Sequence, residues 1–196
     1  MWKEGLLEFS ERFQHTAWGT AHYKRVYEMA IHIARIENKA IDEEALFAAA
    51  LIHDMGAFKP YKDPEKDHAD RSAELCREVL LEKGFPESKM PLVEDIISHH
   101  MYYSSAGKSY EAIIFRDADI LDFLGAVGIT RILSITGFDN WAPDLISAVK
   151  LLEEFYEELP GKLITNEAKK IGEDRKLEME YFIKQLKLET NNFHTL

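Results

Sequence analysis

The spacing of apolar residues along the chain constrains its fold more than any other feature. Apolar side chains recur at intervals of three and four residues in almost every segment, whereas strict alternation over several residues is rare. The first pattern is typical of helices that bury one face, and the second is typical of strands. Val26, Met29, Ile33 and Ile36, for example, would form one inward stripe on a helix. The sequence therefore predicts an all-α bundle in which helices pack on helices.

Turn signals divide this pattern into successive helices. Asp42 is a predicted N-cap, and Gly56 is the predicted end of the helix that follows it. Two prolines and three lysines predict an exposed loop over residues 56–67. Gly125 and Gly128 allow a bend or a close backbone approach after the sixth helix. The predicted helices span about 2–14, 20–38, 43–56, 68–83, 88–101, 110–124, 141–159 and 166–188.

Length and charge limit the number of domains and the kinds of partner. The 196 residues are near the size of one domain, so we expect residues 1–196 to form one, with the C-terminal helices at about 141–190 packed on its core. The chain has 24 basic and 35 acidic residues and a net charge of −11. Such a surface repels nucleic-acid phosphates and anionic lipid headgroups. We expect no nucleic-acid polymer and no membrane as partner, and the sequence leaves a homo-oligomer open.

The cysteine content and the N-terminal residues predict the compartment. Cys76 is the only cysteine, and its helical apolar surroundings predict a reduced, buried thiol. Glu4, Glu8 and Glu11 do not fit a secretory signal. The longest apolar run, Ala45 to Ile52, is shorter than the roughly 20 residues of a membrane span. We therefore expect a soluble, cytoplasmic protein.

The dipeptide His53-Asp54 is the first candidate for chemistry. It ends a predicted helix that is apolar nearly all round and is therefore expected to be buried. A buried imidazole and a buried carboxylate both need partners, because an unsatisfied polar group in the interior costs free energy. A metal ion would satisfy both side chains. A hydrogen bond between a neutral histidine and its neighbour would also do so, and the dipeptide does not decide between these two interpretations.

Carboxylates gather in a second apolar helix. Asp117, Asp119 and Asp122 lie within six positions of it, which is costly unless a cation or an arginine such as Arg116 lies among them. This arrangement favours a metal. His22, taken alone, fits a surface or hydrogen-bonded histidine better than a ligand.

Three further histidines lie beside predicted turns. His68, His99 and His100 each fit a ligand about as well as a cap, a surface contact or a core hydrogen bond. Adjacent residues on a helix point in different directions, so we expect one of His99 and His100 to face the centre and the other to have a lesser part.

The order of these candidates resembles the H...HD...D signature of the HD-domain superfamily of metal-dependent phosphohydrolases. The signature corresponds here to His22, then His53-Asp54, then Asp119. Its flanks are similar to those of a bacterial and archaeal group of small stand-alone HD hydrolases. The matching segments are His22-x-x-Arg25-Val26, Ala50-Leu51-Ile52-His53-Asp54, Asp67-His68 with Ser72-Ala73, Asp117-Ala118-Asp119-Ile120-Leu121-Asp122, and Leu124 to Arg131.

The resemblance implies a metal site inside one helical HD domain. It assigns one divalent ion to His22, His53, Asp54 and Asp119, with Asp117 as the fallback for the last ligand. The family's ligand precedes aliphatic residues, which Ile120 and Leu121 match here.

Some HD proteins hold two metals through extra histidines between the doublet and the last aspartate. His68 with His99 or His100 occupies that interval, and Asp54 would then bridge both ions. A mixture of imidazoles and carboxylates suits Mn, Fe, Co, Ni or Zn, whereas Mg is less at home with nitrogen ligands.

The resemblance further implies hydrolysis of a small phosphate ester, for which a nucleotide is one candidate, by metal-activated water at His53 and Asp54. Arg25 is expected to hold a phosphate oxygen or to support the ligand helix, and Asp122 to orient a ligand. Lys59 and Lys62 are expected either to contact the substrate or to lie in a solvated loop. Arg131 is expected either to contact the substrate or to form an ion pair with an acidic helix.

The sequence departs from specialised members of the superfamily. Met55-Gly56-Ala57-Phe58 offers no acid where nucleotidase members place a glutamate after the doublet, and Met101-Tyr102-Tyr103 replaces the Gly-Tyr-Pro motif of cyclic-dinucleotide members. Two other classes stay open: a di-iron oxygenase of the same fold, and a metal-binding regulatory module without turnover.

Overall fold

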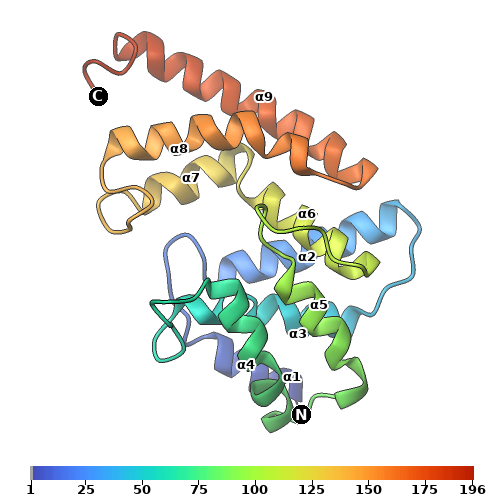
Figure 1. Ribbon diagram of the computed structural model, residues 1–196. Coiled ribbons are helices and arrows are strands. Elements are labelled where there is room, and N and C mark those ends of the chain that lie inside the picture. The colour runs from blue at the N-terminus through green and yellow to red at the C-terminus, as the bar shows by residue number, and fades with distance from the viewer. Residues whose placement is uncertain (1) are drawn as a thin grey trace. The chain divides into compact units, whose positions relative to one another are not determined.

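The computed structural model describes residues 2–196, and every regular element within this range is a helix (Figure 1). The predicted all-α fold is confirmed. Two compact units divide the chain, Met1–Asp119 and Ile120–Leu196, and helix α6 (Tyr110–Asp122) contains the boundary. The expectation that the C-terminal helices pack on the core stays a prediction, because it concerns how the two units are placed relative to each other. No helix in residues 2–196 is long and apolar enough to cross a membrane.

The first unit is built around a short buried helix. The unit contains α1 (Trp2–Ser10), α2 (Thr20–Ile36), α3 (Glu43–Ile52), η1 (Met55–Ala57), α4 (His68–Glu82), η2 (Glu87–Lys89), α5 (Met90–Ser98) and most of α6. Helix α3 packs against α1, α2 and α5, as its nearly uniform apolar surface requires. The predicted N-cap is confirmed, since Asp42 Oδ1 accepts hydrogen bonds from the amides of Glu44 and Ala45 at 3.1 and 3.0 Å.

Helices α1, α3 and α5 end earlier than the sequence predicts: α1 ends at Ser10 rather than near residue 14, and the ends of α3 and α5 place candidate ligands outside a helix. Helix α3 ends at Ile52 rather than at Gly56, so His53 and Asp54 lie in the turn between α3 and η1. Helix α5 ends at Ser98, which leaves His99 and His100 beyond it. The apolar period continues past both ends, so periodicity alone extended the helices too far.

The segment between η1 and α4 is a loop, as predicted, but aromatic contacts hold it. The rings of Phe13 and Phe58 lie 5.2 Å apart, and those of Phe9 and Tyr61 lie 5.8 Å apart. Lys59 and Lys62 are exposed in this loop.

The second unit contains α7 (Gly125–Ser134), α8 (Leu145–Glu158), η3 (Pro160–Lys162) and α9 (Asn166–Glu189). The three α-helices pack on one another. The sequence predicted the bend at Gly125 and Gly128 but not α7 itself. Gly125 has a φ of +68°, and a Cβ on Gly128 would lie 2.0 Å from the carbonyl oxygen of Phe123. Glycine is thus required where the chain turns out of α6 and immediately starts a new helix.

Candidate metal centre

Six side chains from separate parts of the first unit converge at one place. Helix α2 supplies His22, the turn after α3 supplies His53 and Asp54, and the remaining three are His68 at the start of α4, His100 beyond α5, and Asp119 on α6. Five of the six residues are at most 7% exposed, and the His68 side chain is 26% exposed. The cluster is therefore buried and has one side open to solvent.

The four residues of the predicted ligand set lie together in one half of the cluster. His22 Nε2 lies 3.2 Å from His53 Nε2, 3.4 Å from Asp119 Oδ1 and 3.6 Å from Asp54 Oδ2. His53 Nε2 lies 3.3 Å from the same Asp54 oxygen. One ligand atom each from His22, His53 and Asp119 lies within 4.8 Å of the others, which suits a single ion.

The other oxygen of Asp54 faces the remaining histidines. Asp54 Oδ1 lies 3.5 Å from His68 Nε2 and 3.6 Å from His100 Nε2. His53, Asp54 and His100 form a second group with ligand atoms within 4.8 Å. The two carboxylate oxygens of Asp54 thus point to two different sets of imidazole nitrogens.

The hydrogen bonds of the rings test whether these residues fit a metal ion. His53 Nδ1 lies 2.9 Å from the carbonyl oxygen of Ala50, and His100 Nδ1 lies 2.7 Å from that of Ile97. A carbonyl only accepts, so each Nδ1 carries the proton, and each Nε2 of a neutral ring presents a lone pair. Among the described residues, Nε2 of His100 has no hydrogen-bond partner. Lone pairs and carboxylate oxygens that face one another call for a cation, so the residues fit a divalent metal.

The charges of the cluster lead to the same conclusion. Burial lowers the pKa of His53, but the Asp54 and Asp119 carboxylates outweigh burial, so the pKa is raised above its ordinary value. Burial raises the pKa of the Asp54 carboxyl, but the imidazoles of His53, His100 and His68 outweigh it and hold that pKa well below its usual range. Asp54 is therefore ionised, and the site attracts positive charge in the form of protons or a metal.

His68 is held by residues to which the sequence assigned no role. Asp67 caps α4 by accepting a hydrogen bond from the Ala69 amide at 2.8 Å, and its Oδ1 lies 3.7 Å from His68 Nδ1. The hydroxyl of Tyr103 donates to the other oxygen of Asp67 at 2.6 Å. In the sequence, the Asp67-His68 pair was visible only as one of the segments similar to the HD group, whereas Tyr103 carried no signal.

Other predicted residues lie outside the cluster. His99 Nδ1 donates to the carbonyl oxygen of Asp95 at 2.8 Å and lies 3.2 Å from its carboxylate, so His100, not His99, faces the centre. Asp117 is buried on α6 but belongs to neither group suited to a metal. Arg25 is half-buried one turn after His22, and its role stays a prediction.

In the second unit, Arg131 and Asp122 form a buried ion pair. Arg131 Nη1 lies 2.8 Å from Asp122 Oδ2 and donates to the Asp122 carbonyl oxygen at 2.9 Å. The ion pair was one of the two alternatives for Arg131. Its binding of substrate, the orienting role of Asp122 and the substrate contacts of Lys59 and Lys62 stay predictions.

Gly56 sets the spacing between η1 and the start of α4. Its amide donates to Ser72 Oγ at 2.9 Å, and that hydroxyl donates to the carbonyl oxygen of His68 at 2.8 Å. A Cβ on Gly56 would lie 2.3 Å from the same carbonyl oxygen. We expect Gly56→Ala to lower the free energy of unfolding by about 2 kcal/mol, as overpacking does, and to weaken metal binding by moving His68.

Urea unfolding and metal titration measure both effects. Gly161→Ala is the control, because among the described residues no atom lies within 4 Å of a Cβ there, and we expect a change below about 0.5 kcal/mol. Equal stability of the two variants would contradict the packing argument.

The fold and the cluster together define a helical domain whose histidines and aspartates suit a divalent ion. Residues 20–124 match the family model of the HD domain, so the chain belongs to the HD-domain family. The predicted family is confirmed. A comparison with curated proteins found no match.

Solved structures share this fold over nearly the whole chain. A protein from Lactobacillus plantarum is 21% identical with a TM-score of 0.71, and the match covers 97% of each chain. Bacillus subtilis YpgQ in complex with ADP is 23% identical with a TM-score of 0.68 and covers 95% of this chain and 97% of its own. An HD-superfamily hydrolase from Bacillus thuringiensis is 28% identical with a TM-score of 0.64 and covers 96% of both chains. Family and neighbours support the hydrolase class.

Proposed function

We propose that this protein is a metal-dependent phosphohydrolase that cleaves a small phosphate ester at the cluster around Asp54. The observation that carries the proposal is the arrangement of Asp54, whose Oδ2 faces His22 and His53 while its Oδ1 faces His68 and His100. The membership in the HD-domain family and the hydrolase class of a structural neighbour support it.

The residues of the cluster would have different roles at such a site. His22, His53, Asp54 and Asp119 would hold one divalent ion, and His68 and His100 with Asp54 would hold a second. A divalent ion held there lowers the pKa of a coordinated water and offsets negative charge on a phosphoryl group. The backbone carbonyls of Ala50 and Ile97 fix the rings of His53 and His100, so both present Nε2 to the site.

The open side of the cluster determines where substrate enters. His68 is the most exposed of the six residues, so the substrate reaches the site past the start of α4. Lys59 and Lys62 are exposed in the loop before that helix and would attract an anionic substrate to a protein with a net charge of −11. Arg25 would hold a phosphate oxygen from α2.

Nucleotides are the first compounds to test. The Bacillus subtilis protein of the same fold was crystallised with ADP, which supports this choice. The purified chain is freed of metal with a chelator and reloaded with Mn, Fe, Co, Ni or Zn. Release of phosphate or pyrophosphate is then measured with nucleoside mono-, di- and triphosphates and with nitrophenyl phosphate. We expect turnover that is lost with the chelator and recovered with metal.

The alternatives give different results in the same experiment. Oxygen consumption with added iron and no release of phosphate would favour the di-iron oxygenase. Tight metal binding without turnover of any compound would favour the regulatory module.

A further inference from the structure

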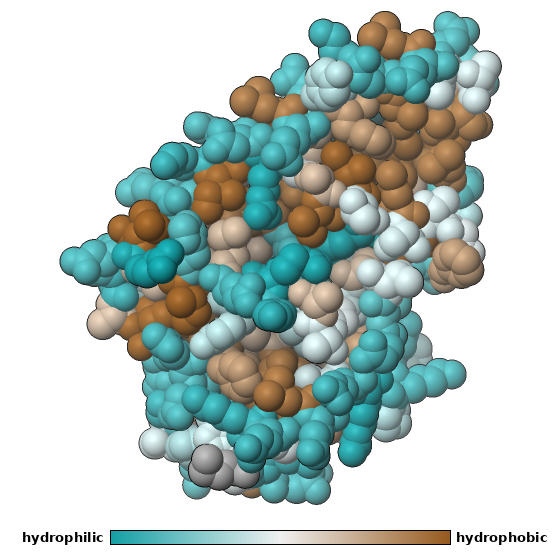
Figure 2. Space-filling model, turned by 180° about the vertical axis from the view of Figure 1, so that it is seen from behind, coloured by the Kyte–Doolittle hydropathy of each residue, from teal (hydrophilic) through white to brown (hydrophobic). Residues whose placement is uncertain are grey.

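Helix α9 carries large apolar side chains on the side opposite its packed face. Its buried residues include Gly172, Met179 and Ile183, and the helix packs on α7 and α8. Three large apolar residues of α9 are instead 63%, 68% and 69% exposed: Leu177, Tyr181 and Leu188. Figure 2 shows apolar side chains gathered among polar ones on the surface of the second unit.

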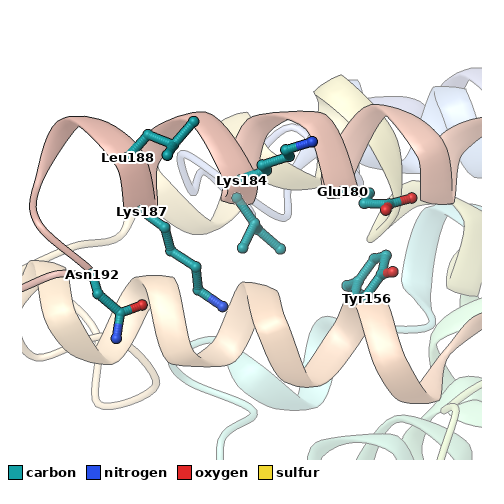
Figure 3. A pocket seen from close by; sticks show the side chains of 7 residues that line it. Tyr156, Glu180, Lys184, Lys187, Leu188 and Asn192 are labelled. Atoms are coloured by element: carbon teal, nitrogen blue, oxygen red, sulfur yellow. The ribbon is translucent and has the colours of Figure 1, made fainter.

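These exposed residues lie on one line along the helix. Leu177, Tyr181, Lys184 and Leu188 follow one another at intervals of four, three and four residues, and we call these four residues the outer stripe. This is the spacing of the core positions of a coiled coil. In Figure 3, Leu188 extends from α9 away from α8, whereas Lys187 reaches towards α8, where it pairs with Glu153 at 2.5 Å.

We propose that the outer stripe binds the outer stripe of a second copy of this chain, with the two α9 helices antiparallel. A twofold axis between Phe182 and Ile183 would place Leu177 opposite Leu188 of the second copy and Tyr181 opposite its Lys184. Each contact then occurs twice, as a twofold interface requires. In this register, each residue of the outer stripe therefore lies opposite a suitable residue of the second copy's outer stripe.

The single charge in the outer stripe selects the antiparallel orientation. Two parallel helices in register would place Lys184 against Lys184 of the second copy, and such like charges repel. The antiparallel pair places the Lys184 ammonium beside the ring of Tyr181, where the ring face attracts a cation. The aromatic ring and the lysine therefore fit a pair in only one of the two orientations.

The outer stripe is short, so the pair is weak. The two preceding positions of the same spacing are polar, Lys170 and Asp174, and the apolar contact is limited to about three turns, or roughly 17 Å. An interface of this size is typical of transient association. We expect a dimer that forms in the micromolar range of chain concentration, on the order of 10 µM or above.

Sedimentation equilibrium of the full chain tests the proposal. The apparent mass of the wild type should rise from 22.6 kDa towards twice that value with concentration, whereas Leu177→Glu should weaken association at least about tenfold. Phe138→Glu is the control, because Phe138 is 92% exposed but lies outside the outer stripe, and its association should equal that of the wild type. Circular dichroism confirms that each variant is folded.

A residue exchange tests the register. Tyr181→Lys places two like charges opposite each other and should weaken association at least about tenfold, whereas the double variant Tyr181→Lys/Lys184→Tyr exchanges the two residues and should recover it to within about threefold of the wild type. A wild-type chain that stays monomeric at about 500 µM overturns the proposal, as does a dimer that Leu177→Glu leaves unchanged. A double variant no stronger than Tyr181→Lys alone overturns the antiparallel register.

Discussion

Replacement of Asp54 by alanine is expected to remove bound metal and to lower turnover of a phosphate ester by about a thousandfold or more. Removal of a residue that merely orients a metal ligand typically costs 10- to 100-fold in affinity or activity. Asp54 should cost more, because its two oxygens lie 3.3 to 3.6 Å from the Nε2 atoms of four histidines. Without this carboxylate, four imidazoles would have to hold divalent cations with Asp119 alone.

Metal content and phosphate release measure this effect on the same preparations. Asp54→Asn keeps the size of the buried side chain and removes only its charge, so it separates loss of metal from loss of packing. Asp117→Asn is the matched control, because Asp117 is fully buried on the helix of Asp119 but belongs to neither group suited to a metal. Undiminished turnover in Asp54→Ala would remove Asp54 from the proposed site.

Apolar spacing predicted most helices of this fold, because most of them bury one face. It did not predict where α1, α3 and α5 end, since apolar residues that follow these helices are also buried, namely Phe13, Met55 and Met101. It also missed α7, because Gly125 and Gly128 are poor helix formers in isolation. Gly128 approaches the backbone of Phe123, and Gly125 has a positive φ beside Arg175 and Glu178, and neither requirement leaves a periodic signal in the sequence.

The candidate site was predictable in its order but not in its details. The resemblance to the HD signature named His22, His53, Asp54 and Asp119, which the structure brings together. Sequence spacing left His99 and His100 equivalent, because the direction of each ring depends on how α5 ends. The hydrogen bond from Tyr103 to Asp67, the residue beside His68, joins positions 36 residues apart, a contact that only the folded chain reveals.

His99 and His100, the two residues that follow the end of α5, give a prediction with a built-in control. Beyond α5, His100 turns its Nε2 to Asp54, whereas His99 turns to Asp95. We expect His100→Ala to lose one of two bound metal equivalents and to lower turnover by about a hundredfold, because it removes a proposed ligand rather than a supporting residue. His99→Ala should keep both equivalents and retain turnover to within about threefold, since it removes only part-buried contacts with Asp95.

Elemental analysis and turnover on the two variants decide between two metals and one. Thermal unfolding of the metal-free proteins serves as the folding control, because both substitutions remove a ring that donates to a backbone carbonyl. If the wild type binds a single equivalent and His100→Ala retains it, then the oxygen of Asp54 that faces His68 and His100 serves to position the carboxylate. Equal losses of metal from both variants would instead show that the turn beyond α5 acts as a unit and that the direction of the His100 ring does not decide binding.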